Sequence, residues 1–156
     1  MRIALAAVLF VTVLSCGGTS AAARPSPAGL LANPCSYLTK ADFQSTLGLP
    51  MEGYRAGQTC GYLDSRGNTC QVTVLADNGQ YAAAKETASK YGAVESLGAG
   101  DKSFYSAQPQ RPGVWIFDFG LMKGTAFAGA LCGAKFGSSN PKPQAVRLGN
   151  LIASRL

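Results

Sequence analysis

The sequence VWIFDFGL, residues Val114–Leu121, is the strongest strand candidate in the chain, and the other elements are placed outward from it. Its aromatic and β-branched residues favour an extended conformation. Alternation along a strand puts its three aromatic residues on one face and Ile116, Asp118 and Gly120 on the other. We therefore expect Asp118 to lie on a sheet face or edge. The alternative is that Asp118 is a functional acid.

Further strand candidates lie on both sides of this stretch. Lys102–Ala107 precedes it across an expected loop at Gln108–Gly113, and the Ala- and Gly-rich segment Thr125–Phe136 follows it after a turn at Lys123-Gly124. Ala93–Leu97 is a weaker candidate for an additional short strand. Connections this short favour antiparallel pairing.

The sequence before these strands indicates a β-hairpin. Gln58–Asp64 and Thr69–Ala76 are strand-like runs on either side of the polar turn Ser65–Asn68. A helix over about Lys40–Leu47 is expected before the hairpin, because Thr39 and Asp42 have the spacing of a capping box.

Two more helices complete the predicted fold. One covers Gln80–Tyr91, and the other follows the capping residues Ser138–Asn140 with Pro141 in its first position. The resulting order is α-β-β-α-β-β-β-α. We predict an α+β fold with a single antiparallel sheet and the helices packed on one face.

The N-terminal stretch MRIALAAVLFVTVLSC, Met1–Cys16, has the pattern of an export signal. Arg2 is followed by an apolar run that is too short to span a bilayer, and Val13–Cys16 resembles a bacterial lipobox. We expect residues 1–15 to be removed as a signal peptide and Cys16 to carry a lipid. The alternative is an ordinary secretory peptide that is cut nearby.

The rest of the chain is expected to form a flexible tether, residues 16–33, and one domain, residues 34–156. The tether is rich in Ala, Gly, Ser and Pro, which favours an unordered linker. These segments predict a protein that is lipid-anchored to the outer face of the cell membrane.

Charge and composition narrow the possible functions. The formal net charge is +6, but the basic residues are scattered and form no dense patch, so we expect no nucleic-acid partner. The chain contains no His, the commonest general base and metal ligand. We predict no enzyme activity, no catalytic residue, no metal and no cofactor.

Four cysteines remain after Cys16: Cys35, Cys60, Cys70 and Cys132. In an exported domain they predict two disulfides, with three possible pairings. The hairpin register puts Cys60 and Cys70 on opposite faces or two rungs apart, beyond disulfide reach, which also disfavours Cys35–Cys132. Of the other two pairings we prefer Cys35–Cys60 with Cys70–Cys132. A zinc site is the alternative, disfavoured by the compartment and by the absence of a CxxC pair.

Three segments, NPCSYLTKADFQSTLG, TCGY and VESLGAGDKSF, resemble actinobacterial envelope lipoproteins of unknown function. In that family the domain opens with a Pro-Cys-x-x-Leu-Thr helix ending in Leu-Gly, followed by a Cys-x-aromatic strand and a turn containing Leu-Gly. The resemblance covers roughly Asn33–Tyr105 and implies no activity. The matching positions are Pro34, Cys35, Leu38, Thr39, Leu47, Gly48, Cys60, Tyr62, Leu97 and Gly98.

Two further motifs are better explained by structure than by chemistry. Gly98–Ser103 is similar to a phosphate loop, but Asp101 interrupts the required sequence and would repel phosphate. Ser139–Lys142 matches the Ser-x-x-Lys spacing of penicillin-recognising enzymes, but helix capping explains it and the companion motifs are absent.

The single Trp of the chain, Trp115, is expected in the core. The alternative is an aromatic binding surface shared with Tyr105 and Tyr62. The most favoured function is a non-enzymatic envelope module that binds an unknown protein or small ligand. The alternatives are an inhibitor of an exported hydrolase, which needs a protruding loop such as Gln108–Gly113, and an envelope enzyme with an unrecognised site.

Overall fold

The computed structural model describes residues 35, 37–56, 59–90 and 92–156. The expected signal peptide (1–15), Cys16 and the tether (16–33) lie outside the described residues, as does Pro34. The elements, in chain order, are α2 (Lys40–Leu47), β1 (Glu52–Ala56), β2 (Thr59–Leu63), β3 (Thr69–Ala76), α3 (Gln80–Ser89), β4 (Lys102–Arg111), β5 (Val114–Lys123), β6 (Ala126–Lys135) and α4 (Lys142–Arg155).

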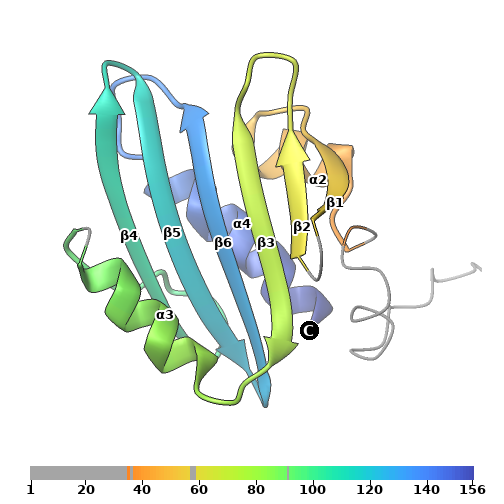
Figure 1. Ribbon diagram of the computed structural model, residues 1–156, viewed down its shortest axis with the longest axis vertical. Helices are drawn as coiled ribbons and strands as arrows, with labels where there is room; N and C mark the ends of the chain where they lie inside the picture. Colours follow the sequence, from red (N-terminus) through yellow and green to blue (C-terminus); the bar gives the residue numbers. More distant parts are fainter. Residues whose placement is uncertain (1–34, 36, 57–58, 91) are drawn as a thin grey trace, which may run out of the picture.

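Within the described residues, the strands form one six-stranded antiparallel sheet in the order β1-β2-β3-β6-β5-β4 (Figure 1). This confirms the predicted antiparallel α+β architecture. The hairpin β2–β3 forms around the predicted turn, and β4, β5 and β6 make a meander. Pairing of β3 with β6 joins these two parts into one sheet.

The sequence analysis did not predict β1. Its residues, EGYRA, include a Gly and two charged side chains, so their intrinsic strand preference is weak. Strand β1 forms because it pairs along its whole length with β2 at the edge of the sheet. There the ring of Tyr54 lies over the backbone of Gly61. Any side chain at position 61 would collide with this ring.

The prediction of a loop over Gln108–Gly113 is wrong, because β4 continues to Arg111. Only Pro112 and Gly113 connect β4 to β5. Strand β4 is an edge strand, so Pro109 does not remove a ladder hydrogen bond that a second neighbour would need. The register shifts between Pro109 and Arg111. The weak candidate Ala93–Leu97 is reduced to a single bridge between Glu95 and Tyr105.

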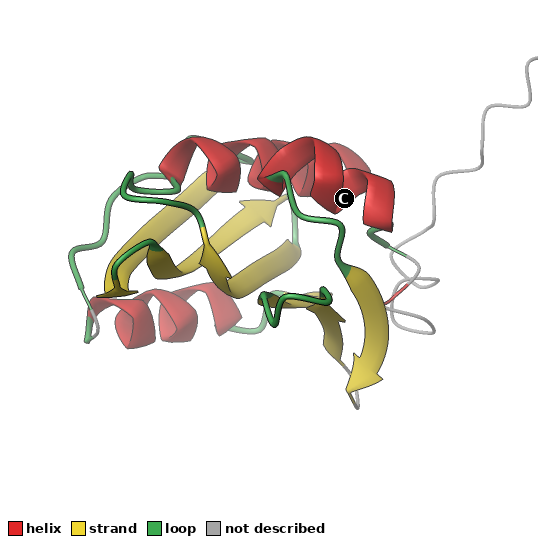
Figure 2. Ribbon diagram, turned by 90° about the horizontal axis from the view of Figure 1, so that it is seen from above, coloured by secondary structure: helices red, strands yellow, loops and turns green. Residues whose placement is uncertain are grey.

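The helices lie on both faces of the sheet, not on one as predicted. Figures 1 and 2 show α2 and α4 on one face and α3 on the other. The side of α3 that carries Tyr81 and Ala88 faces the sheet: Ala88 is buried, and the ring of Tyr81 lies 5.7 Å from that of Phe104. The 3.6-residue period of a helix shows which of its sides is buried. It does not show which face of the sheet that side packs against.

The helix ends follow local chemistry. At α2 the side chain of Thr39 accepts from the backbone of Asp42, whose carboxylate accepts from the backbone of Thr39, so the capping box is confirmed. Gly48 ends this helix with a φ of 74°. The last helix begins one residue later than expected, with Pro141 at the N-cap and Pro143 in its first turn.

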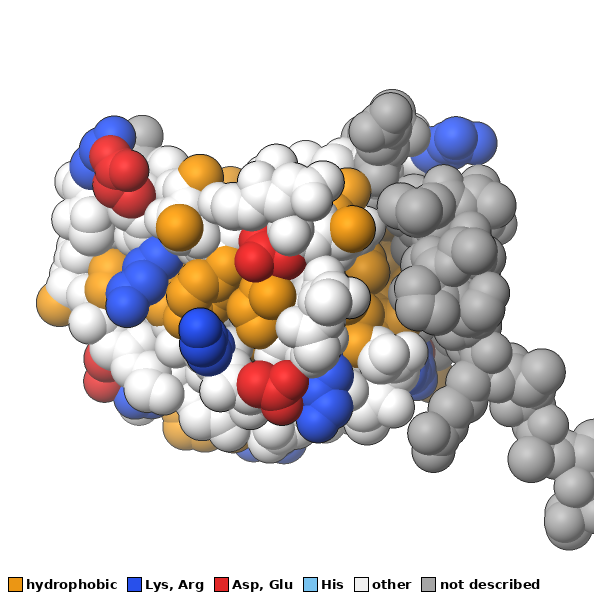
Figure 3. All heavy atoms as spheres, turned by 90° about the horizontal axis from the view of Figure 1, so that it is seen from below, with side chains coloured by type: hydrophobic (Ala, Val, Ile, Leu, Met, Phe, Trp, Pro, Cys, Tyr) orange, Lys and Arg blue, Asp and Glu red, His pale blue; other side chains and the backbone are white. Residues whose placement is uncertain are grey.

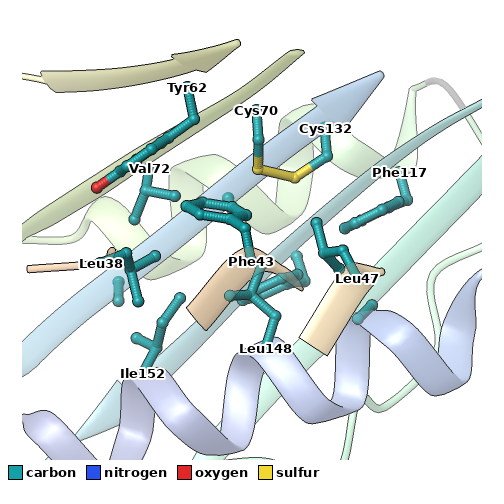
Figure 4. Close-up of a cluster of buried hydrophobic side chains, with 14 of the residues drawn as sticks. Leu38, Phe43, Leu47, Tyr62, Cys70, Val72, Phe117, Cys132, Leu148 and Ile152 are labelled. Carbon is teal, nitrogen blue, oxygen red and sulfur yellow. A yellow bond between two sulfur atoms is a disulfide. The ribbon is translucent and has the colours of Figure 1, made fainter. Parts of the chain in front are cut away.

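The main core lies between the sheet and the α2–α4 pair (Figure 4). Phe43 and Leu47 of α2 and Leu148 and Ile152 of α4 point towards the sheet, where they meet side chains such as Phe117. All five are 5 % exposed or less. This layer therefore buries the large apolar side chains of both helices and of the sheet.

Both preferred disulfides are present. Cys35 pairs with Cys60 at a Cα–Cα distance of 5.0 Å, and Cys70 pairs with Cys132 at 4.0 Å. Cys70 and Cys132 are direct partners in the β3–β6 register, so this bond links the two parts of the sheet. Cys60 lies opposite Val72, two residues from Cys70, as the hairpin register predicts.

Candidate functional site

Asp118 lies on the face of β5 that points away from the main core. In the register, Ser106 of β4 is directly beside it on one side and Leu131 of β6 on the other. Phe117 and Phe119 point to the opposite face, where both are fully buried. The predicted alternation, with Asp118 on a sheet face, is therefore confirmed.

A hollow of about 370 Å³ opens beside Asp118, between the sheet and the last two turns of α3. Ile116 and Leu131 line it from the sheet, and Thr87 and Ala88 line it from the helix. We call this hollow the groove. Its lining residues are Thr87, Ala88, Ser106, Ala107, Gln108, Ile116, Asp118 and Leu131.

Two neighbouring hollows of about 270 and 400 Å³ also border Leu131. Although Leu131 lies in a central strand, its exposed fraction is 49 %. Gly129 and Gly133 occupy the same face of β6 on either side of it and contribute no side chain. The sheet surface is therefore hollowed on both sides of Leu131.

The electrostatics of the groove depend on one carboxylate. Burial raises the pKa of Asp118 to about 6. The structure gives this carboxylate no hydrogen bond or ion pair with another described residue, and no other Asp, Glu, Lys or Arg is among the described residues that line the three hollows. One carboxylate in an apolar groove can orient a ligand through a single polar contact.

The alternative of an aromatic surface shared by Trp115, Tyr105 and Tyr62 does not hold, and the expectation that Trp115 lies in the core is wrong. Tyr62 and Tyr105 are each only 1 % exposed, because both rings lie on the core face of the sheet. The Tyr105 hydroxyl donates to the side chain of Asn140. Trp115 is half-buried, and its Nε1 donates to the carbonyl oxygen of Gly137 at 3.1 Å.

The two motifs considered above both serve local structure. The backbone N–H groups of Gly98 and Ala99 lie 3.1 and 3.3 Å from Oγ of Ser103, to which they donate within the turn. Asn140 lies one residue before the N-cap of α4, Pro141, and its side chain accepts from the backbone N–H of Lys142. These donors and acceptors are used within the fold.

On the face of the described residues that Figure 3 draws, charged side chains of one sign do not gather in one place. Figure 3 views the lower end of the molecule in Figure 1 and shows hydrophobic side chains in the middle, with acidic and basic side chains scattered around them. Several oppositely charged pairs lie at the surface, among them Lys123–Asp101 and Lys142–Glu95. The expectation of no nucleic-acid partner stays a prediction.

Comparisons with protein-family models, with curated proteins and with solved structures found no match. The resemblance to actinobacterial envelope lipoproteins therefore stays a prediction. Across the part of the chain that the structure describes, no helix has the length and apolar character needed to cross a membrane.

The sequence analysis missed the groove although it considered Asp118. The groove forms only when α3 packs on the face of the sheet that carries Asp118. The sequence pattern does not determine which face α3 covers. A local signal was present in β6, where Gly129, Leu131 and Gly133 share one face. A large apolar side chain between two glycines indicates a hollowed sheet surface.

Proposed function

We propose that this protein is a non-enzymatic ligand-binding domain of the cell envelope, held at the outer face of the membrane by a lipid on Cys16. The groove is the proposed ligand site. The observation that carries this proposal is an apolar hollow that contains a single carboxylate, Asp118, with no second charged side chain among its described lining residues. Such a site orients a ligand through one polar contact.

The size and lining of the groove support a small ligand. Its volume of about 370 Å³ lies within the range of small-molecule pockets, about 300–1,000 Å³. Ile116, Leu131 and Ala88 supply apolar surface, while Thr87, Ser106, Gln108 and Asp118 supply polar groups. A mostly apolar hollow with few polar groups is typical of ligand sites.

An inhibitor of an exported hydrolase, the first alternative, would need a protruding loop such as the one expected at Gln108–Gly113. Gln108–Arg111 is paired into β4, so this segment presents no protruding loop to a hydrolase. The enzyme alternative is tested with a panel of ester, peptide and glycoside substrates. We expect no turnover, and turnover that Asp118→Asn abolishes would support an enzyme instead.

The binding site is tested with 4-phenylbutan-1-ol, a probe with an apolar body and one polar end. The probe is titrated into the isotope-labelled full chain in phosphatidylcholine nanodiscs, with empty nanodiscs as the blank. We expect saturable shifts of the Ile116 methyl signals in nuclear magnetic resonance spectra. Leu131→Arg should abolish these shifts by placing a charged side chain in the groove.

Leu63→Arg is the matched control. Leu63 has a similar exposed fraction, 45 % against 49 % for Leu131, but it borders a different hollow, with Lys40, Glu52 and Asp64. This variant should bind the probe as the wild type does. The proposal that the groove is the ligand site would be contradicted if Ile116 showed no saturable shift. It would also be contradicted if Leu131→Arg and Leu63→Arg weakened probe binding equally.

A further inference from the structure

We propose that the ligand of the groove is a small cationic amphiphile. Its ammonium group pairs with the carboxylate of Asp118, and its hydrocarbon body covers Ile116 and Leu131. This inference deepens the proposed function and rests on it, because it names the chemical class that the same site takes.

The charge of the site favours a cation. Asp118 projects from the middle of β5, and the described residues that line the hollows beside it from α3, β3, β4 and β6 are all uncharged. A carboxylate that is partly removed from water is stabilised by an opposite charge within about 4–6 Å. The described part of the chain does not supply that charge here, and a ligand ammonium would. The polar residues of this lining are Gln71, Thr73, Gln80, Thr87, Ser106 and Gln108.

Cationic, neutral and anionic ligands differ in how they interact with Asp118. Burial raises the pKa of Asp118 to about 6, so at pH 7.5 the empty groove is anionic. An anionic ligand would be repelled, and a neutral apolar ligand would remove still more water from the carboxylate. A cation instead favours the ionised form and lowers its pKa. Binding should therefore weaken as the pH falls below about 6 and Asp118 becomes protonated.

The walls of the groove fit a ligand with an apolar body. Leu131 leaves 49 % of its surface exposed beside Asp118, and Ile116 and Ala88 extend the apolar wall towards α3. The space of about 370 Å³ matches one drug-sized molecule. These dimensions favour a free small amine with one apolar group over a membrane lipid with two acyl chains.

The test uses three probes with the same apolar body: 4-phenylbutylamine, 4-phenylbutan-1-ol and 4-phenylbutanoate. Each is titrated at pH 7.5 into the full chain in phosphatidylcholine nanodiscs, and the dissociation constant is taken from the Ile116 methyl shifts. The alcohol can also donate a hydrogen bond to Asp118, but only the ammonium adds the attraction of an opposite charge, so the amine should bind roughly 10- to 100-fold more tightly than the alcohol. The carboxylate should bind most weakly.

Asp118→Asn tests the origin of this preference, because it keeps the shape of the side chain and removes the charge. In this variant the amine and the alcohol should bind with equal affinity. A second measurement needs no variant: in the wild type the advantage of the amine should shrink between pH 7.5 and pH 5. The carboxyl carbon signal of Asp118 should also report a lower pKa when the amine is bound.

The outcomes separate this inference from the proposed function. If the Ile116 shifts saturate and the amine and the alcohol bind with equal affinity, the groove remains a ligand site. The inference that its ligand is a cation would then be overturned. Tightest binding of the carboxylate, or an amine preference that survives both Asp118→Asn and pH 5, would also overturn it. Absence of Ile116 shifts with all three probes would overturn the proposed function itself.

Discussion

At the scale of single residues, one ion pair ties both ends of the domain together. The carboxylate of Asp42, in the first turn of α2, accepts from both terminal nitrogens of Arg155 at 2.6 and 2.8 Å. Nη1 of Arg155 lies 2.5 Å from the carbonyl oxygen of Tyr37, to which it also donates. Because the Asp42 and Arg155 side chains are only 14 % and 27 % exposed, water screens this pair little.

Arg155→Met should therefore destabilise the protein by about 1–3 kcal/mol at pH 7. Burial alone would raise the pKa of Asp42, but the hydrogen bonds from Arg155 and Thr39 outweigh it and hold the pKa below its usual range. The native state thus binds fewer protons than the unfolded state near pH 4, and the contribution of the pair is lost as the pH falls below 3.8.

Chemical denaturation of the full chain at pH 7 and pH 3 measures both effects. The difference between wild type and Arg155→Met should shrink at pH 3. Lys40→Met is the control, because the Lys40–Glu52 pair is exposed and its loss should change stability little. A difference between wild type and Arg155→Met that does not depend on pH would contradict the role of the pair.

Asp118 should have the opposite pH dependence. Its pKa in the folded protein, about 6, lies above the ordinary 3.8, so the native state binds more protons and stability falls as the pH rises from about 4 to 6. Asp118→Asn should therefore stabilise the protein by about 1–3 kcal/mol at pH 7.5. At pH 4 it should leave the free energy of unfolding almost unchanged. Denaturation curves at both pH values check this, and an equal gain at both would contradict it.

At the scale of secondary-structure elements, the position of α3 depends on Gly120 of β5. A Cβ at this position would lie 2.5 Å from the ring of Phe104 and 2.9 Å from that of Phe127. Both rings are buried on the α3 side of the sheet, and Tyr81 of α3 packs edge-on against Phe104. The absence of a side chain at Gly120 makes space for the surface on which α3 packs.

Gly120→Ala should destabilise the protein by about 1–3 kcal/mol, because it overpacks this small second core. Amide hydrogen exchange in α3 should increase more than exchange in α4. Gly133→Ala is a matched control on β6, since its Cβ would have only ordinary contacts at 3.6 Å or more. Equal stability of the two variants would show that α3 does not depend on this close packing.

The two disulfides should differ in their effect on stability. Cys70–Cys132 closes a sequence separation of 62 residues and Cys35–Cys60 one of 25. In the loop-entropy model the longer loop contributes more, about 4.3 against about 3.5 kcal/mol. The double variant Cys70→Ala/Cys132→Ala should therefore lose slightly more stability than Cys35→Ala/Cys60→Ala, as measured by denaturation of exported protein. The reverse order would show that loop entropy does not set the ranking.

At the scale of the whole molecule, the proposed location depends on Cys16, outside the described residues. In a cell that exports the protein, the wild type should fractionate with membranes, and mass spectrometry should find an acylated N-terminal Cys16. Cys16→Ala should release the protein from the membrane fraction or leave it with its signal peptide attached. An unmodified wild-type N-terminus that begins after Cys16 would contradict lipid anchoring.

The sequence by itself determined the features that depend on nearby residues. The bounds of α2 and its capping box follow from contacts between residues three or four positions apart. The hairpin turn and the alternation of side chains along β5 depend on equally local geometry. The hairpin register limited the cysteine pairings, and the structure contains the preferred pair of disulfides.

Only the tertiary structure decided which face of the sheet each helix covers. The apolar stripe of α3 requires burial, but its period is the same whichever face it packs against. The space above Gly120 and the rings of Phe104 and Phe127 determine the choice, and they come from three different strands. The groove beside Asp118 exists because of that choice, so it was not apparent from any single stretch of sequence. Burial of Tyr62 and Tyr105 and the pairing of β1 likewise depend on neighbours that the chain brings together only when it folds.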